Sequence, residues 1–246
     1  MEPKVIIFEN PQEISEYVVD ILAEELKKKK NLVMALPTGR TIVPVYKELS
    51  KTYKKKSLNF SKTHIFNLDE YIGLKLEHKT SFKYFMDKNL FTKINVKEKN
   101  MHYLSGSAVN MKKECEQYEN QIKKAGGLDL TILGLGVNCH IAFNEPGSPF
   151  DSRTRKIILT HETRRSNFGI LSTLRAPKHA LTVGIATILE SKKIILIATG
   201  GHKAKAMKSM LQSPISTNCP ASALRKHKDV TILLDKKAAS LLTSKN

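Results

Sequence analysis

The sequence predicts an α/β fold with one doubly wound, mostly parallel sheet and helices on both faces. Short apolar runs rich in β-branched residues recur along the chain, and amphipathic helical patterns lie between many of them. Several of these runs are apolar without alternation, which is typical of strands that are covered on both faces. Alternating strands and helices of this kind indicate a Rossmann-like sheet.

Seven runs are predicted to be strands because they are short, apolar and rich in β-branched residues: 4–8, 31–36, 63–68, 128–136, 180–185, 193–200 and 230–235. Residues 11–29 carry apolar side chains close to a 3.6-residue period and end in lysines, as an amphipathic helix does. Residues 107–127 form a second predicted helix, which ends at Gly126 and Gly127. A third helical pattern covers 43–51.

The length and composition favour one domain that spans residues 1–246. The chain is 41% hydrophobic and 26% charged, as in soluble globular proteins, and no linker or internal repeat divides it. Residues 146–179 have weak periodicity and many polar side chains. Such a segment predicts a mobile lid over a binding site.

The formal net charge of +18 is unusual, because 41 lysines and arginines face 23 acidic residues. Clustered basic residues can bind nucleic acid. Here the lysines are scattered without interleaved aromatic residues, which favours a solvated surface over a nucleic-acid partner. A positive surface also steers small anions toward a cleft.

Targeting and cysteine patterns predict a cytoplasmic protein with no membrane association. No apolar run reaches the roughly 18 residues of a membrane span, and the N-terminal sequence lacks the pattern of a secretory signal. The three cysteines, Cys115, Cys139 and Cys219, are widely spaced and form no CxxC motif. We therefore expect reduced thiols and no metal site.

Four polar loops follow predicted strands, and ligands of such sheets bind outside the carboxyl ends of the strands. The loop at 37–41 suits a phosphate, because backbone N–H groups at Gly39 can be joined by the hydroxyls of Thr38 and Thr41. An ordinary tight turn fits the same residues. Lys203 follows the strand at 193–200 in the same manner, although a single lysine is commonly exposed to solvent.

Asp69 and Glu70 come directly after the strand at 63–68. Side chains of adjacent residues diverge, so we expect one carboxylate to enter the cleft while the other braces the loop. A carboxylate at this place can act as a general base for a carbon-bound proton. Helix or turn capping is the alternative, because aspartate is well suited to it.

The segment "GLGVNCHIAFNEP" at 134–146 allows several kinds of chemistry. A Cys139–His140 nucleophile requires neighbouring side chains to meet, which is uncommon, and no oxyanion-hole pattern supports it. A metal site lacks further ligands at a suitable spacing. A proton-transfer centre fits better, because a carboxylate such as Glu145 fixes the tautomer of His140 and raises its basicity. A purely structural histidine remains an alternative.

The combined motifs resemble the glucosamine-6-phosphate deaminase (isomerase) family, in particular its shorter bacterial members. The resemblance covers nearly the whole chain and rests on these segments in the family's order: "LPTGRT", "FNLDEYIGL", "HKTSFKYFM", "GLGVNCHIAFNEPGS", "SRTRKIILTHETR", "ALTVGIATIL" and "GGHKAKAM". It implies the sheet of a sugar-phosphate isomerase. It also implies conversion of glucosamine 6-phosphate and water to fructose 6-phosphate and ammonia, without a metal or organic cofactor.

The resemblance also implies residue roles. Asp69 corresponds to the base that moves a proton between C2 and C1 of the open-chain sugar. His140, with Glu145 and Asn138 as its orienting partners, corresponds to the group that opens the sugar ring. Residues 38–41 (Thr38, Gly39, Arg40 and Thr41) and Lys203 correspond to the phosphate site. Arg155 lies in a segment that binds an effector in larger members.

Several residues depart from the family pattern. Asn138 occupies a position that is often aspartate or asparagine, and Cys139 replaces a usual glycine. Arg40 lies where the family has glycine or serine, and Gly169 lies where it has a phosphate-binding arginine. Because Arg40 can supply the charged donors that Gly169 cannot, we expect Arg40 to compensate. The alternatives are compensation by Arg165, a different substrate, or an Arg40 that faces solvent.

Several functions remain open at this point. Related enzymes act on galactosamine 6-phosphate or hydrolyse a lactone, and the stereochemistry of the sugar cannot be read from the motifs. A noncatalytic sugar-phosphate sensor is a further alternative, although a sensor has no need of a base at Asp69. The expected partner is a small sugar phosphate, and both a monomer and a homo-oligomer are compatible with the sequence.

Overall fold

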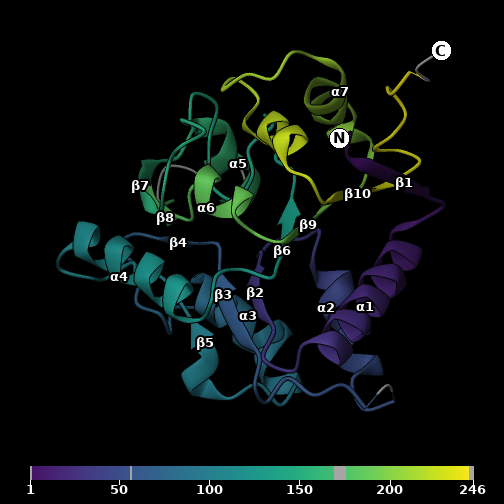
Figure 1. Ribbon diagram of the computed structural model, residues 1–246. Coiled ribbons are helices and arrows are strands. Elements are labelled where there is room, and N and C mark those ends of the chain that lie inside the picture. Colours follow the sequence, from purple (N-terminus) through teal and green to yellow (C-terminus); the bar gives the residue numbers. More distant parts are fainter. Residues whose placement is uncertain (1, 56, 169–175, 244–246) are drawn as a thin grey trace.

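The structure, a computed structural model, describes residues 2–55, 57–168 and 176–243. Within these residues, the central sheet has seven parallel strands in the order β1-β10-β9-β6-β2-β3-β5 (Figure 1). Its strands are β1 (Lys4–Phe8), β2 (Val33–Leu36), β3 (His64–Asn67), β5 (Met101–His102), β6 (Leu130–Gly134), β9 (Lys193–Ala198) and β10 (Val230–Asp235). The predicted doubly wound, mostly parallel α/β fold is confirmed.

The strand order reverses between β2 and β6. From β2 the chain proceeds outward to β3 and β5, and then returns to the other side of β2, where β6 pairs with it. From β6 the chain proceeds outward in the opposite direction, through β9 to β10. Ligands of open α/β sheets bind at such a reversal, beyond the carboxyl ends of the strands. The loops after β2 and β6 flank this position.

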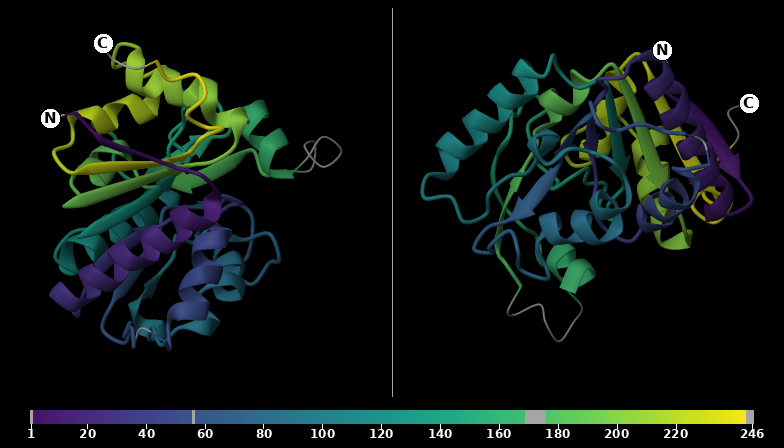
Figure 2. Two further views of the ribbon diagram at one scale, coloured as in Figure 1. Left: turned by 90° about the vertical axis from the view of Figure 1, so that its right-hand side faces the viewer. Right: turned by 90° about the horizontal axis from the view of Figure 1, so that it is seen from below.

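Helices cover both faces of the sheet. They are α1 (Pro11–Lys28), α2 (Val43–Thr52), α3 (Phe82–Asn89), α4 (Met111–Lys124), α5 (His161–Phe168), α6 (Ile185–Leu189) and α7 (Ala204–Gln212). One buried cluster joins α1, α2 and α3 to one face, and another joins α4, α6 and α7 to the opposite face. Figure 2 shows α1 and α2 on one side of the sheet and α7 on the other. Four short 3₁₀ turns complete the description: η1 (Phe91–Lys93), η2 (Glu98–Asn100), η3 (Gly201–Lys203) and η4 (Pro220–Lys226).

Local sequence accounts for the start of α1. The side chain of Asn10 accepts hydrogen bonds from the backbone N–H groups of Gln12 and Glu13, and proline follows at the first helical position. These features satisfy the amide groups that a helix start leaves unpaired. Among the described residues, none of the helices has the length and hydropathy needed to cross a membrane.

A small antiparallel sheet of three strands lies beside the central one: β4 (Asp69–Tyr71), β8 (His179–Thr182) and β7 (Arg155–Ile158). Residues 180–182 of the run predicted at 180–185 lie in strand β8, whereas 183–185 do not, and β8 belongs to this sheet and not to the central one. Thr182 pairs with both Asp69 and Arg155, so β8 is the middle strand. The correction has a physical reason, because β4 continues from β3 after Leu68 and offers β8 an edge with which to pair.

The segment proposed as a lid, 146–179, contains β7 and α5 in its described part. Residues 169–175 lie outside the described residues, and they include Gly169, which the motifs place at a phosphate-binding position. The lid and the consequence of Gly169 therefore stay predictions.

Candidate active site

The loop after β2 lies against the ends of β6 and β9. A cavity of about 10 Å³ is lined by Pro37, Thr38, Thr41 and Ile42 from this loop, together with Leu133, Gly134 and Ile197. Residue 39 is a glycine because the turn needs a backbone φ of +100°, which is strained for other residues. The fold thus places the predicted phosphate loop at the reversal of the strand order.

Asp69 is the first residue of β4 and only 7% exposed. Burial, and secondly the nearby charge of Glu70, raise the pKa of the Asp69 carboxyl well above its usual value. A carboxylate with an elevated pKa is a stronger base than an exposed one. Such a perturbed group at the end of a parallel strand is a candidate for proton transfer.

Glu70 turns away from Asp69 and braces the next helix. Its Oε1 accepts the backbone N–H groups of Tyr71 at 2.9 Å and Phe82 at 3.0 Å. Its Oε2 accepts those of Phe82 at 2.9 Å and Lys83 at 3.2 Å, at the start of α3. The two adjacent carboxylates therefore have separate surroundings, as the sequence predicts.

In the loop after β6, the imidazole of His140 packs against the backbone of Gly136 in the same loop. A Cβ atom at residue 136 would lie 2.3 Å from the imidazole Nδ1, so only the glycine present leaves room for the ring. The Gly136 N–H donates to the carbonyl of His140 at 2.8 Å and closes this turn. Cys139 adopts a φ of +67°, a conformation in which glycine is more usual.

The thiol of Cys139 lies away from the histidine. Its Sγ donates to the carbonyl of Ala206 at 3.5 Å, and it shares a hydrogen bond with the thiol of Cys219. This bond to Cys219, and then burial, raise the pKa of Cys139. A thiol that resists ionisation is a poor nucleophile, which argues against the Cys139–His140 pair.

Asn138 connects His140 and Glu145. The Nδ1 of His140 lies 2.7 Å from Oδ1 of Asn138, whose Nδ2 donates to Oε2 of Glu145 at 2.9 Å. The direct distance from His140 Nδ1 to Glu145 Oε2 is 3.7 Å. Glu145 Oε1 also accepts the N–H and the hydroxyl of Thr160, each at 3.2 Å. The structure brings together the three residues of the sequence motif, and it adds that Asn138 lies between the other two.

The electrostatics of His140 favour the neutral imidazole. Burial lowers its pKa to about 4, opposed by the negative charge of Glu145 and assisted by the positive charge of Lys203. The ring is therefore neutral at pH 7, with its Nε2 lone pair available as a base.

Lys203 ends the 3₁₀ turn η3, after β9. Burial, and then the charge of Arg40, lower the pKa of Lys203 to about 8. The pKa of His202 is also lowered, first by burial and then by the positive charges of Lys203 and Arg40. The negative charge of Asp235 partly offsets this effect. Arg40, His202 and Lys203 thus form a basic group contributed by the loops after β2 and β9. The matching segment "GGHKAKAM" includes His202, but the resemblance assigns a role only to its neighbour Lys203.

Arg155 lies in β7, away from this basic group. Its guanidinium donates to Oδ1 of Asn144 at 2.8 Å and to Oγ of Ser148 at 2.9 Å. These partners belong to the loop that carries Glu145. The role of Arg155 as an effector-binding residue stays a prediction.

A family model described as glucosamine-6-phosphate isomerases/6-phosphogluconolactonase matches residues 9–233. The chain belongs to this family. A glucosamine-6-phosphate deaminase of Thermoanaerobacter sp. (strain X514) is 43% identical over 240 residues, which cover 97% of this chain and 95% of the relative. Glucosamine-6-phosphate deaminase 1 of Giardia intestinalis is 44% identical over 223 residues, with coverages of 90% and 84%.

Solved structures of family members give a consistent result. A structure described as a monomeric glucosamine-6-phosphate deaminase has a TM-score of 0.94 at 39% identity, covering 97% of this chain and 100% of that chain. A 6-phosphogluconolactonase from Thermotoga maritima has a TM-score of 0.75 at 23% identity, with coverages of 95% and 99%. The second similarity shows a common fold alone.

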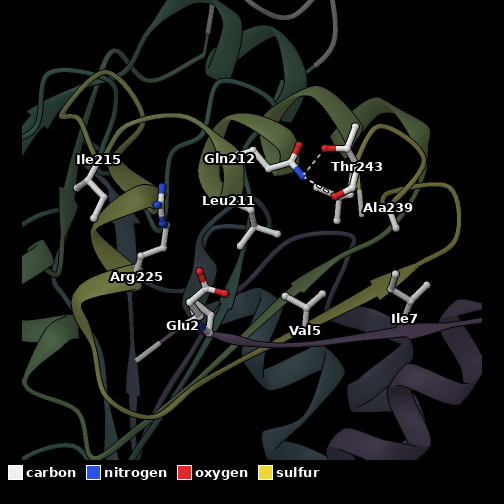
Figure 3. Close-up of a pocket in the computed structure, with 11 residues that line it drawn as sticks. Glu2, Val5, Ile7, Leu211, Gln212, Ile215, Arg225, Ala239 and Thr243 are labelled. Carbon is white, nitrogen blue, oxygen red and sulfur yellow. Dashed lines mark hydrogen bonds between the residues drawn. The ribbon is translucent and has the colours of Figure 1, made fainter. Parts of the chain in front are cut away.

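A larger hollow lies elsewhere in this family member. A cavity of about 620 Å³ lies between β1, α7 and the residues that follow β10, and Figure 3 shows Val5, Ile7 and Leu211 among its lining side chains. None of the proposed catalytic or phosphate-binding residues lines it. The candidate active site is thus distinguished by its polar groups and not by the size of its cavity.

Proposed function

We propose that this chain is a glucosamine-6-phosphate deaminase, which converts glucosamine 6-phosphate and water to fructose 6-phosphate and ammonia. The principal observation is the buried carboxylate of Asp69, whose pKa is raised, at the same edge of the sheet as His140. The names of relatives that are 41–44% identical over most of the chain support the same activity.

We assign ring opening to the neutral His140. Its Nδ1 hydrogen is committed to Asn138, so Nε2, which has no hydrogen-bond partner among the described residues, can accept the proton of the sugar's C1 hydroxyl. The C1–O5 bond then breaks, and the ring oxygen O5 takes up the proton that Nε2 has accepted, so the imidazole returns to its neutral form. The product is the open-chain aldehyde. A base whose pKa is about 4 is unprotonated over the whole neutral range and is therefore always ready to accept.

We assign the isomerisation to Asp69. The proton on C2 is acidic because C2 is adjacent to the C1 aldehyde. Removal of this proton by the carboxylate gives an enolamine with a C1–C2 double bond. Return of the proton to C1 gives a ketimine at C2, which water hydrolyses to the ketose and ammonia. The raised pKa of Asp69 suits both steps, because the same group must accept the proton and then donate it.

The phosphate fits the basic group of Arg40, His202 and Lys203. A phosphate monoester needs several donors, and Lys203 and Arg40 lie close enough for the charge of Arg40 to lower the pKa of Lys203. The hydroxyls of Thr38 and Thr41 and the N–H groups of their loop add neutral donors. Binding of an anion relieves the repulsion between Arg40 and Lys203.

The lactonase activity that also occurs in the family is less consistent with this site. Lactone hydrolysis requires an activated water and no base for a carbon-bound proton. The lactonase structures that match are 16–23% identical and show only the common fold. A deaminase is thus the better assignment, and a galactosamine 6-phosphate substrate is the second candidate.

We also propose that the active site is complete within one chain in the cytoplasm. The fold of one chain places Asp69, His140, Glu145 and Lys203 after strands β3, β6 and β9 of the central sheet, and a relative of 39% identity is described as monomeric. Light scattering of the purified protein during turnover tests whether a single chain is active, and we expect the mass of a monomer.

The decisive experiment measures ammonia release from glucosamine 6-phosphate and galactosamine 6-phosphate, beside hydrolysis of 6-phosphogluconolactone. We expect ammonia and fructose 6-phosphate from the first substrate, and no ammonia with an Asp69→Asn variant. Lactone hydrolysis without ammonia release would refute the proposal. Unphosphorylated glucosamine serves as a control for the phosphate site.

A further inference from the structure

The two hydrogen bonds of Arg155 reach the loop between β6 and β7 at two points. NH1 donates to Oδ1 of Asn144 at 2.8 Å, and NH2 donates to Oγ of Ser148 at 2.9 Å. Asn144 is fully buried and Ser148 is 8% exposed. Hydrogen bonds from a charged group to buried neutral partners are stronger than ordinary ones, and losing one leaves a buried polar atom unpaired.

Asn144 is the central residue of this loop. Its Nδ2 donates to the carbonyls of Ile141 at 3.0 Å and Val183 at 2.9 Å, and its backbone N–H donates to Ile141 at 3.0 Å. Both hydrogens of the amide are thereby used, and Oδ1 faces Arg155. The side chain closes the turn that begins directly after His140 and ties it to the end of β8.

Glu145 lies between the two points that Arg155 holds. Asn144 precedes it, and the N–H of Ser148 donates to its backbone carbonyl at 3.0 Å. The carboxylate of Glu145 in turn accepts a hydrogen bond from Nδ2 of Asn138, and Oδ1 of Asn138 contacts the imidazole of His140. A connected series of hydrogen bonds therefore leads from β7 to the ring-opening base.

We propose that Arg155 is a positioning residue for the ring-opening step, because it fixes Glu145 and, through Asn138, the imidazole of His140. This inference rests on the proposed function for the identity of the step. Arg155 itself contacts neither the basic group nor Asp69, so its effect passes through the loop 141–148. A misplacement of about 1 Å at a reacting group can cost around 100-fold in rate, so a modest loosening of this loop is sufficient.

The chain contains a matched control for Arg155. Arg153 lies two residues earlier, and its guanidinium pairs with Glu190 at the surface, where half of the Arg153 side chain is exposed. Arg153→Gln removes the same charge from nearly the same place without touching the loop. A general effect of removing a positive charge near β7 would therefore appear in both variants, whereas an effect on the position of the loop 141–148 would appear only in Arg155→Gln.

The test compares Arg155→Gln, Arg153→Gln and Ser148→Ala with the wild-type protein. For Arg155→Gln we expect kcat on glucosamine 6-phosphate to fall by about 10- to 100-fold. Its KM, and its affinity for the ring-opened analogue 2-amino-2-deoxyglucitol 6-phosphate, should stay within about twofold, because neither depends on ring opening. Ser148→Ala should give a smaller loss, since one of the two bonds remains. A fourth variant, Arg155→Ala, leaves space for a guanidinium ion, and adding this ion should restore part of its kcat.

A second readout does not need turnover. The pKa of His140, followed by NMR, should rise in Arg155→Gln toward the ordinary value, because a loosened loop admits water to the ring; Arg153→Gln should leave it unchanged. An unchanged kcat and an unchanged His140 pKa in Arg155→Gln would overturn the inference. Equal losses in kcat and analogue affinity would also overturn it. If the wild-type protein releases no ammonia, the proposed function fails, and the His140 pKa still tests the contact.

Discussion

The Nδ1 of His140 lies 2.7 Å from Oδ1 of Asn138, and this contact defines the tautomer of the imidazole. The Glu145 carboxylate can only accept hydrogen bonds, so the amide nitrogen of Asn138 must face it and the amide oxygen must face the ring. His140 therefore carries its hydrogen on Nδ1, and Nε2 has the free lone pair. Asn138 thus fixes the tautomer of His140 without placing a negative charge next to the ring.

The first prediction concerns Asn138→Leu, which keeps the size of the side chain but removes its hydrogen bonds to His140 and Glu145. We expect kcat on the cyclic sugar to fall by roughly 100-fold, which is the lower end of what general acid–base catalysis contributes. Binding of the ring-opened analogue should be retained, because Lys203 and Asp69 are unaffected. Steady-state kinetics with calorimetry measure both quantities. Loss of analogue binding together with kcat would indicate a collapsed site instead.

The second prediction separates the two adjacent carboxylates. Asp69→Asn should abolish exchange of the C2 proton with solvent while leaving the melting temperature close to that of the wild type. Glu70→Gln should instead lower stability, because one of the acceptor oxygens for the N–H groups of Tyr71, Phe82 and Lys83 becomes a donor. Proton exchange followed by NMR and thermal unfolding check the pair. Wild-type exchange in Asp69→Asn would contradict its role as the base.

Parts of this architecture follow directly from the sequence. The apolar runs identify the strands β2, β6 and β9 because these strands are buried on both faces, and the reversal between β2 and β6 explains why the polar loops converge. The run at 180–185 was misplaced because apolar content does not reveal a strand's partner. β7 and β4 escaped prediction because they are short and their residues lack a continuous apolar pattern.

The residues of the candidate site could be proposed from the sequence, but the hydrogen bonds between them could not. The motif identifies Asn138, His140 and Glu145, yet the position of the amide between the other two depends on the left-handed turn at Cys139. Likewise, Arg155 stands out in its motif, but its bonds to Asn144 and Ser148 depend on how β7 pairs with β8. Such contacts between distant segments have no local signature in the sequence.

The third prediction is an alkaline limit set by Lys203. The pKa of this lysine is lowered from its ordinary value to about 8 by burial and by Arg40. Its charged form binds phosphate, and that form is lost as the pH rises through this value. We therefore expect kcat/KM to decline above about pH 8. Lys203→Arg should move the decline to higher pH, because arginine stays protonated. An unchanged alkaline profile in this variant would exclude Lys203 as the cause.

The fourth prediction concerns stability at the opposite edge of the sheet. Asp129 accepts hydrogen bonds from Lys29, Lys192 and the N–H of Val33, and these bonds outweigh burial and lower its pKa. A lowered folded-state pKa contributes stability that is present above the unfolded pKa and is lost as the pH falls through the folded one. Asp129→Asn should therefore cost about 2 kcal/mol at pH 7.

The cost of Asp129→Asn should shrink as the pH is lowered from 7 to 3, because the stability that the ionised carboxylate contributes begins to be lost below its ordinary pKa of 3.8. Urea unfolding at both pH values measures the difference. Asp151→Asn, at an exposed position, is the control and should have little effect at either pH. A cost that is the same at both pH values would show that packing, and not charge, is responsible.

The last prediction concerns Arg40, which stands where family members usually have glycine or serine. Its positive charge acts on both Lys203 and His202, so it lies beside the groups that are expected to hold the phosphate. A charge-assisted hydrogen bond contributes roughly 1.5–3 kcal/mol, which corresponds to an affinity change of about 10- to 150-fold. An arginine that points into solvent would contribute nothing measurable to binding.

We therefore expect Arg40→Ala to raise KM for glucosamine 6-phosphate about tenfold or more and to leave kcat nearly unchanged, because the phosphate is remote from the reacting carbons. Arg40→Lys should keep part of the affinity, since it retains the charge but not the two parallel donors. Lys208→Ala, an exposed cation on α7, controls for the general positive field. Arg40→Ala should also raise the pKa of Lys203, because it removes a neighbouring positive charge, and so move the decline in kcat/KM to higher pH. An unchanged KM together with an unshifted limit would assign Arg40 to the solvated surface.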